Sequence, residues 1–262
     1  MAARILFLPH GGGPMPLLHD PEHSALTEFL ETVPDRLGTP EAILVISAHW
    51  EMPVPHVTAG AAPELIYDYG GFPPEAYEIR YPAPGNPGLA RELAAALEQA
   101  GVPCVLDEGR GYDHGMFVPL KLMYPEASVP VIQLSLLASL DAAQHIALGQ
   151  LLAPLRERNI LVVGSGMSFH NLRAFFVPGL VSDEDNVAFE SWLQDTCSSE
   201  MEEGERMRRL ANWHQAPGAL KCHPRPEHLL PLHVCYGMAR TKAEVVFDGA
   251  VMGKHVTGLL WE

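Results

Sequence analysis

A series of short, continuous apolar runs constrains the fold of this chain more than any other feature. Most of these runs are rich in Val, Ile and Leu and do not alternate with polar residues, so the predicted strands need cover on both faces. They lie at residues 5–8, 42–47, 102–106, 129–134 and 160–163, with weaker ones at 244–247 and 255–259. A sheet of such strands has to be buried between two layers of helices.

Helical patterns lie between the runs. The clearest covers residues 88–100, where Leu89, Leu93 and Leu97 share one side and Gly101 ends the helix. Other helices are predicted at residues 115–123, 142–156, 183–196 and 203–213. Strands that alternate with helices predict the α/β class, as a three-layer α/β/α domain around a central mixed, mostly parallel sheet. Nothing in the 262 residues resembles a linker, so we expect a single domain.

The composition argues against several kinds of partner. The formal net charge of −15 argues against nucleic acid, because phosphate binding needs a basic surface. The four cysteines form no CxxC pair, which indicates reduced thiols in a cytoplasmic protein rather than a disulfide framework. No stretch approaches the roughly 20 apolar residues that cross a bilayer, and the first apolar run is too short for a signal peptide. We therefore expect a soluble protein that binds neither nucleic acid nor a membrane.

Four histidines lie at or near the ends of predicted elements. His10, His49 and His170 each follow one of the apolar runs, and His228 lies close to a helix start that Pro226 would mark. In an α/β sheet, ligands collect just beyond the carboxyl ends of the strands. These imidazoles are therefore predicted to converge on one metal ion.

Other side chains could complete or replace this set. Glu227 precedes the last of the four histidines, and its carboxylate would complete a triad of two histidines and one carboxylate. Glu51 is a further carboxylate near the second histidine, and Cys222 with His223 forms a competing pair. The glycines of the HGGG segment could instead form a phosphate-binding loop, but neither GxGxxG nor GK[ST] is present.

The long irregular region 53–87 and the residues around it are candidates for a substrate site. A loop of this length in a compact domain is usually functional, so we expect it to form a wall of the site. His114 is predicted on a tight turn before a helix, and Asn171 could hold the preceding imidazole or a substrate oxygen. The aromatic walls would come from Tyr67, Tyr69, Phe72 and Tyr77. These rings could also serve only to pin the loop to the surface.

Taken together, these segments resemble the class III extradiol ring-cleavage dioxygenases of the LigB type, and specifically the DOPA 4,5-dioxygenase branch. They span nearly the full chain in the order of that family, and only residues 174–224 carry no motif of it. No single motif would identify the family, but the set is specific. The matching segments are PHGGGPMP at 9–16, ISAHWE at 46–51, residues 67–87, residues 111–136, GSGMSFHNLR at 164–173 and RPEHLLPLHV at 225–234.

The resemblance implies one extradiol dioxygenase-like catalytic domain over residues 1–262 with a single non-haem ferrous ion. It implies that His10, His49 and His228 are the metal ligands. It also implies that His170 is the acid–base residue, or a fourth ligand, and that His114 binds substrate or handles a proton. In the protocatechuate branch of the superfamily the third ligand is a glutamate, so the glutamate beside His228 stays an alternative.

The activity implied by the resemblance is ring cleavage of a catechol, DOPA-like or otherwise substituted, with O2 to a muconic semialdehyde. Zinc could occupy the same site, but it cannot change its redox state and would give an inactive protein. One alternative is a zinc-dependent hydrolase, since three histidines and a water also form a hydrolytic site, although no HExxH is present. The other is a non-catalytic relative that keeps the histidines for metal or peptide binding.

Overall fold

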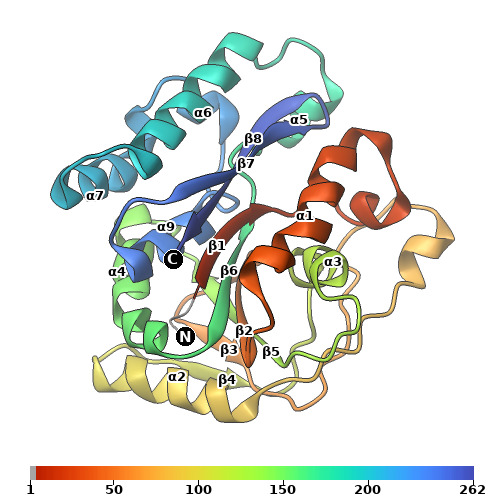
Figure 1. Cartoon of the computed structure of the whole chain (residues 1–262), viewed down its shortest axis with the longest axis vertical. Helices are drawn as coiled ribbons and strands as arrows, with labels where there is room; N and C mark the ends of the chain where they lie inside the picture. Colours follow the sequence, from red (N-terminus) through yellow and green to blue (C-terminus); the bar gives the residue numbers. More distant parts are fainter. Residues whose placement is uncertain (1–3) are drawn as a thin grey trace.

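The structure, a computed structural model, describes residues 4–262 and is built on one mixed sheet of eight strands (Figure 1). Across the sheet the strands follow the order β4-β3-β5-β2-β6-β1-β8-β7. The strands are β1 (Arg4–Pro9), β2 (Ala42–Met52), β3 (His56–Thr58), β4 (Val105–Asp107), β5 (Val131–Leu137), β6 (Ile160–Gly166), β7 (Glu244–Val251) and β8 (Lys254–Trp261). The central strands β5, β2, β6 and β1 are all parallel to one another, which confirms the predicted mixed, mostly parallel sheet.

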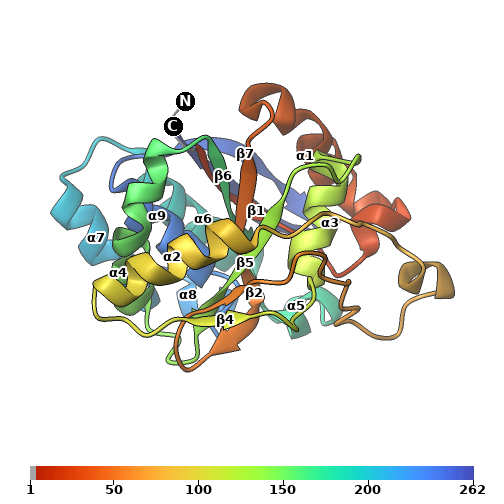
Figure 2. The same ribbon diagram turned by 90° about the horizontal axis from the view of Figure 1, so that it is seen from below.

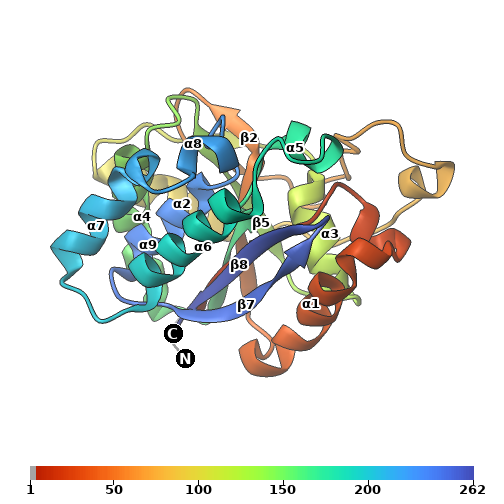
Figure 3. The ribbon, with the colours of Figure 1, turned by 90° about the horizontal axis from the view of Figure 1, so that it is seen from above.

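Helices cover both faces of the sheet, as the continuous apolar runs predicted. Helices α1 and α3 pack on one face, whereas α4 and α9 pack on the other (Figure 1). Seen from below, α2 lies with α4 and α9, and seen from above, α6 lies beside β8 (Figures 2 and 3). The helices are α1 (Ser24–Leu37), α2 (Pro87–Gln99), α3 (His114–Met123), α4 (Ala142–Leu152), α5 (Leu172–Phe176), α6 (Asp183–Ser198), α7 (Glu203–Ala211), α8 (Ala219–Cys222) and α9 (Leu230–Ala239). The 3₁₀ turns are η1 (Met15–Leu18), η2 (Pro21–His23), η3 (Pro74–Tyr77), η4 (Ala153–Glu157) and η5 (Trp213–Gln215).

Several boundaries differ from the predictions for a physical reason. The helix predicted at 142–156 ends at Leu152 and continues as η4, where Pro154 cannot donate a backbone hydrogen bond. Helix α9 begins at Leu230, so Pro231 and not Pro226 occupies its first turn. Helix α1 and strand β3 were not predicted at all.

The core lies between the sheet and its two helical layers. Strand β6 is buried along its whole length, and all ten residues of α9 are buried because the helix lies between the sheet and α4. Glycines let α4 and α9 approach closely: a Cβ on Gly237 would lie 2.1 Å from the Ile146 carbonyl oxygen. No helix within residues 4–262 is long and apolar enough to span a membrane.

Candidate metal centre

The carboxyl ends of the parallel strands bring the first histidines to one edge of the sheet. His10 follows β1 directly, and its backbone N–H donates to the Gly166 carbonyl at the end of β6, at 3.1 Å. His49 lies inside β2 and not beyond its end, because the strand predicted to stop at Ser47 continues to Met52. The pairing of β2 with β5 shifts register between Ile46 and Glu51, so the histidine lies on the irregular part of the strand.

Two further histidines reach the same edge from the second half of the chain. His170 follows β6 after a short coil, and its backbone N–H donates to the Cys222 carbonyl at 3.1 Å. His228 lies in the turn before α9, and its carbonyl accepts from the Met167 N–H at 2.9 Å. The end of β6 therefore holds the turn that carries His228.

The imidazoles from these elements converge. The ring centroids of His10, His49 and His228 lie between 4.9 and 5.2 Å apart in all three pairs. The Nε2 atoms of His10 and His49 are 3.1 Å apart. His114 lies 3.9 Å from His49 between ring centroids, and His170 stacks on His228 at 3.4 Å. Two groups of potential ligand atoms result, one of His10, His49 and His114 and one of His170, Glu227 and His228.

The Nδ1 atoms of four of these imidazoles have partners in the surrounding protein. His10 Nδ1 lies 3.0 Å from the Ser165 hydroxyl, which itself donates to the Gly115 carbonyl and therefore accepts from the imidazole. His114 Nδ1 donates to Asp68 at 2.8 Å.

Glu227 holds the Nδ1 atoms of the other two imidazoles, those of His228 and His170. Its Oε1 atom accepts from His228 Nδ1 at 2.9 Å and from His170 Nδ1 at 3.1 Å. Such partners fix the tautomer and leave each Nε2 lone pair free for a metal or a substrate. Burial opposes ionisation of the Glu227 carboxyl, but the hydrogen bond from His170, a backbone hydrogen bond and the nearby His170 and Arg225 together lower its pKa.

Burial keeps the central imidazoles neutral. Desolvation, followed by the proximity of the other histidines, holds the pKa of His10 and of His228 well below the ordinary value. Desolvation and the nearby His114 lower the pKa of His49 to about 4. A neutral imidazole is the form that binds a metal ion, so these three side chains present lone pairs and no charge to the space between them.

A cavity of about 330 Å³ opens beside the histidines. His114, Tyr69 and Phe72 line it, as predicted. Tyr67 and Tyr77 do not line it; the Tyr67 hydroxyl donates to the Ile79 carbonyl at 2.7 Å and so pins the loop.

Asn171 lies outside this cavity, contrary to the prediction that it contacts substrate. Its side-chain oxygen accepts from the Ala174 N–H and caps α5, and its Nδ2 donates to the Lys221 carbonyl at 2.8 Å. The competing pair of Cys222 and His223 is also directed away from the cavity, because His223 Nε2 lies 2.5 Å from the Ser168 carbonyl oxygen. Glu51 binds Arg225 through both of its oxygens.

Sequence reasoning missed a group of cavity residues that come from distant parts of the chain. Asp68 was visible within the YDYGG segment as a carboxylate beside predicted aromatic walls. The apolar residues had no such signal, because only the folded chain brings them together. The missed residues are Met15, Asp68, Met167, Leu172, Phe175, Phe176 and Met252.

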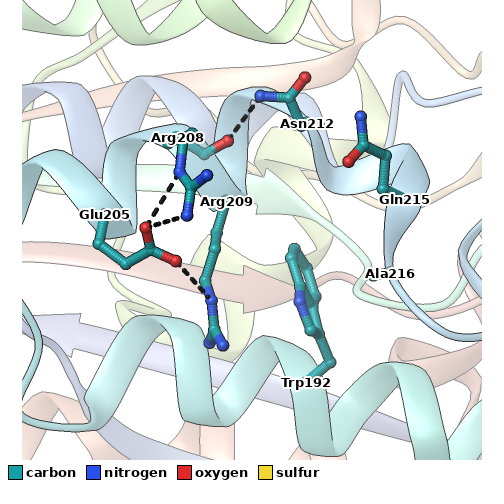
Figure 4. Close-up of a pocket in the computed structure, with 7 residues that line it drawn as sticks. All are labelled: Trp192, Glu205, Arg208, Arg209, Asn212, Gln215 and Ala216. Atoms are coloured by element: carbon teal, nitrogen blue, oxygen red, sulfur yellow. Dashed lines mark hydrogen bonds and ion pairs between the residues drawn. The ribbon is translucent and has the colours of Figure 1, made fainter.

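A larger cavity of about 470 Å³ lies between α6 and α7, and none of these histidines lines it (Figure 4). Its charged side chains already pair with each other, since Glu205 binds both Arg208 and Arg209. Arg209 also binds Asp195 at 2.7 Å. We therefore assign it no role in the chemistry of the histidine site.

Comparison with known proteins points to one family. A family model described as the catalytic LigB subunit of aromatic ring-opening dioxygenase matches residues 5–256. A 4,5-DOPA dioxygenase extradiol of Beta vulgaris is 41% identical over 261 residues, covering 94% of this chain and 92% of that protein. The protein of that name from Escherichia coli K12 is 39% identical over 229 residues, covering 87% and 82%. The crystal structure of an uncharacterized protein from Escherichia coli K12 matches with a TM-score of 0.80 and 32% identity, covering 99% of this chain and 100% of that one.

Proposed function

The chain belongs to the family of catalytic LigB subunits of aromatic ring-opening dioxygenases and is an extradiol ring-cleavage dioxygenase, and on this premise we propose that it opens the ring of a substituted catechol. The reaction would use O2 and one ferrous ion and would give a muconic semialdehyde. Residues 1–262 would act as one catalytic domain, because the family match covers residues 5–256 and the strands of this region form a single sheet.

We propose His10, His49 and His228 as the ligands of the ion. Three observations support them: their rings are mutually close, burial keeps them neutral, and the Nδ1 atoms of His10 and His228 are held by Ser165 and Glu227. Two Nε2 atoms 3.1 Å apart, at least one of them without a hydrogen, require a proton or a cation between them. The donor set therefore fits a divalent ion that accepts imidazole ligands.

Glu227 is less suited to be the third ligand than His228. Its Oε1 atom is already shared by the Nδ1 atoms of His170 and His228, which makes it a carboxylate that orients two imidazoles. In the alternative in which Glu227 replaces His228, only Oε2 would be left for the ion, and that oxygen lies 3.2 Å from Arg225.

A ferrous ion held by His10, His49 and His228 would supply a Lewis acid that lowers the pKa of the catechol hydroxyls and a redox couple for O2. The protein would supply the proton transfers and the orientation of the ring. We propose that His170 Nε2 takes the proton of the second hydroxyl and later returns it, since Glu227 already holds its Nδ1. His114 Nε2 would hydrogen-bond a substrate oxygen, since Asp68 holds its Nδ1.

The rest of the cavity would bind the ring itself. Tyr69 and Phe72 provide aromatic faces, and the Tyr69 hydroxyl donates to the Ala76 carbonyl at 2.6 Å, which fixes that face in place. A flat apolar wall with few polar groups is what a catechol ring requires.

The convergence of three neutral imidazoles from three separate elements carries this proposal, and oxygen uptake tests it. Protein loaded anaerobically with one equivalent of Fe²⁺ is mixed with 4-methylcatechol in air-saturated buffer. We expect one O2 consumed per catechol and a yellow product, whereas zinc-loaded protein should consume none. Iron-loaded protein that takes up no O2 from any catechol would contradict the proposal, and hydrolysis without oxygen uptake would point to a hydrolase instead.

A further inference from the structure

The walls of the active-site cavity that carry no histidine are almost entirely apolar. Thioether and hydrocarbon side chains come from η1, the residue after β6, α5 and the turn between β7 and β8. Among residues 4–262, no lysine or arginine lines the cavity. Its one carboxylate, Asp68, accepts from both the backbone N–H and Nδ1 of His114.

Arg225, three residues before His228, already has carboxylate partners in the protein. Arg225 binds both oxygens of Glu51, at 2.7 and 2.6 Å, and also contacts Glu227 at 3.2 Å. It does not line the active-site cavity but a second one, which it shares with Glu51, Glu227 and the other side of His49 and His228. A carboxylate in the active-site cavity would therefore find no cationic partner.

Apolar side chains continue from the cavity to the surface along α5. Leu172 and Phe176 line the cavity, yet they are 61% and 70% exposed. Val177 and Leu180, which follow the helix, are 46% and 42% exposed. Figure 3 shows α5 at the upper edge of the molecule, above the sheet and near the ends of β2 and β8. Exposed apolar residues that adjoin a binding cavity commonly mark where a ligand extends.

Resting on the proposed function, we propose that the substrate is a catechol with an uncharged, apolar ring substituent that extends from the cavity over α5. A neutral hydrocarbon group would be removed from water by Leu172 and Phe176, which is favourable. A carboxylate or an amino acid group would lose water without a partner and would approach Asp68 in a protein of net charge −15. An ammonium group would have to compete for Asp68, whose Oδ1 already accepts from the backbone N–H and Nδ1 of His114 and whose Oδ2 lies 3.8 Å from His49 Nδ1.

The test compares kcat/KM of the iron-loaded enzyme across matched catechols. The neutral series is 4-methyl-, 4-butyl- and 4-hexylcatechol, and the charged set is 3,4-dihydroxyphenylpropionate, DOPA and dopamine. We expect kcat/KM to rise roughly threefold to fourfold for each added methylene until the chain leaves the protein. The charged compounds should fall about 100-fold or more below the neutral one of similar length.

Two variants test whether the apolar side chains of α5 set this substrate preference. Leu172→Arg should reduce kcat/KM for 4-hexylcatechol and raise it for 3,4-dihydroxyphenylpropionate. Leu220→Arg is the matched control, because Leu220 on α8 is similarly exposed, at 64%, and does not line the cavity. It should change neither value.

The outcomes separate this proposal from the function on which it rests. If no catechol consumes O2, the proposed function fails, and calorimetric binding of 4-hexylcatechol and 3,4-dihydroxyphenylpropionate to zinc-loaded protein still decides the preference. Equal or better use of DOPA, dihydroxyphenylpropionate or dopamine, or equal binding of the two calorimetric ligands, would overturn the proposal.

Discussion

At the scale of single residues, Glu227 connects a proposed metal ligand to the proposed acid–base residue through one carboxylate oxygen. It accepts from His228 and from His170, whose rings are stacked. Orientation of both imidazoles therefore depends on a side chain that would itself touch neither metal nor substrate. Partners of this kind usually affect metal affinity by an order of magnitude or more when they are removed.

We expect Glu227→Ala to weaken iron binding by about 10- to 100-fold and to reduce turnover even at saturating iron. Competition with a chelator measures the affinity, and oxygen uptake at saturating iron measures the second effect. Glu51→Gln is the control, because it breaks an ion pair with Arg225 and removes no contact to an imidazole. Unchanged affinity in Glu227→Ala would show that the imidazoles are oriented by something else.

His170→Ala should keep stoichiometric iron and lose turnover by about 10²- to 10⁴-fold, since a positioned acid–base group contributes about that much. Iron content and catechol cleavage are measured on the same sample. Loss of the iron would instead make His170 an indispensable ligand.

Glu190 should make the folded protein less stable as the pH rises. Its side chain is 3% exposed, and burial raises its pKa to about 8, against the hydrogen bond from Thr257. Below the ordinary value of 4.5 both folded and unfolded chains hold the proton; between 4.5 and about 8 only the folded chain does. The free energy of unfolding therefore falls with rising pH across this window, by up to about 1.4 kcal/mol per pH unit from this group.

Urea unfolding of the wild type and of Glu190→Gln at pH 5.5 and pH 8.5 measures this effect. The difference between the two proteins isolates Glu190 from the histidines, which titrate in both. Equal pH dependence in the two proteins would contradict the assignment.

At the scale of elements, the continuous apolar runs were readable from sequence, but the ends of the strands were not. Strand β2 continues through polar residues to Met52 because Glu51 and Met52 pair with β5. Helix α9 gives no amphipathic pattern, since every residue of it is buried. Helix α1 does carry such a pattern, with Leu26, Leu30 and Leu37 buried, and it holds Pro34 within its last turn.

Close packing of α4 against α9 depends on their glycines. We expect Gly237→Ala to destabilise the protein by about 1–3 kcal/mol, because its Cβ would lie 2.1 Å from the Ile146 carbonyl oxygen. Gly204→Ala in α7 is the matched control, because no atom lies within 4 Å of its added Cβ. It should stabilise the helix by about 0.5–1 kcal/mol. Urea unfolding distinguishes the two, and equal effects would show that the helices can separate without cost.

At the scale of the whole molecule, sequence reasoning placed the four histidines together because parallel strands end at one edge of a sheet. It could not find the apolar wall, since Met15, Leu172 and Met252 become neighbours only through the tertiary fold. It also placed Asn171 in the cavity, where the local requirement to cap α5 decided otherwise.

A metal bound by His10, His49 and His228 would join the first two strands to the turn before α9. We expect Fe²⁺ or Zn²⁺ at 100 times its dissociation constant to stabilise the fold by about 2.7 kcal/mol. That corresponds to a rise in Tm of roughly 5–10 °C for a domain of this size. Differential scanning calorimetry with and without a chelator measures the rise. His10→Ala should abolish it and His255→Ala, a half-exposed histidine beside Asp248, should not; a rise that persists in His10→Ala would contradict the ligand set.

The position of β1 in the middle of the sheet also has a consequence for biosynthesis. Its neighbours are β6, where Arg4 pairs with Leu161, and β8, where Ile5 pairs with Trp261. During translation the strand that leads into His10 therefore emerges from the ribosome with neither neighbour yet made. Contacts of such high contact order close late and slowly, and an unpaired apolar strand is prone to aggregation until they do. A metal centre built on His10, His49 and His228 could therefore assemble only after most of the chain, as far as His228, has left the ribosome.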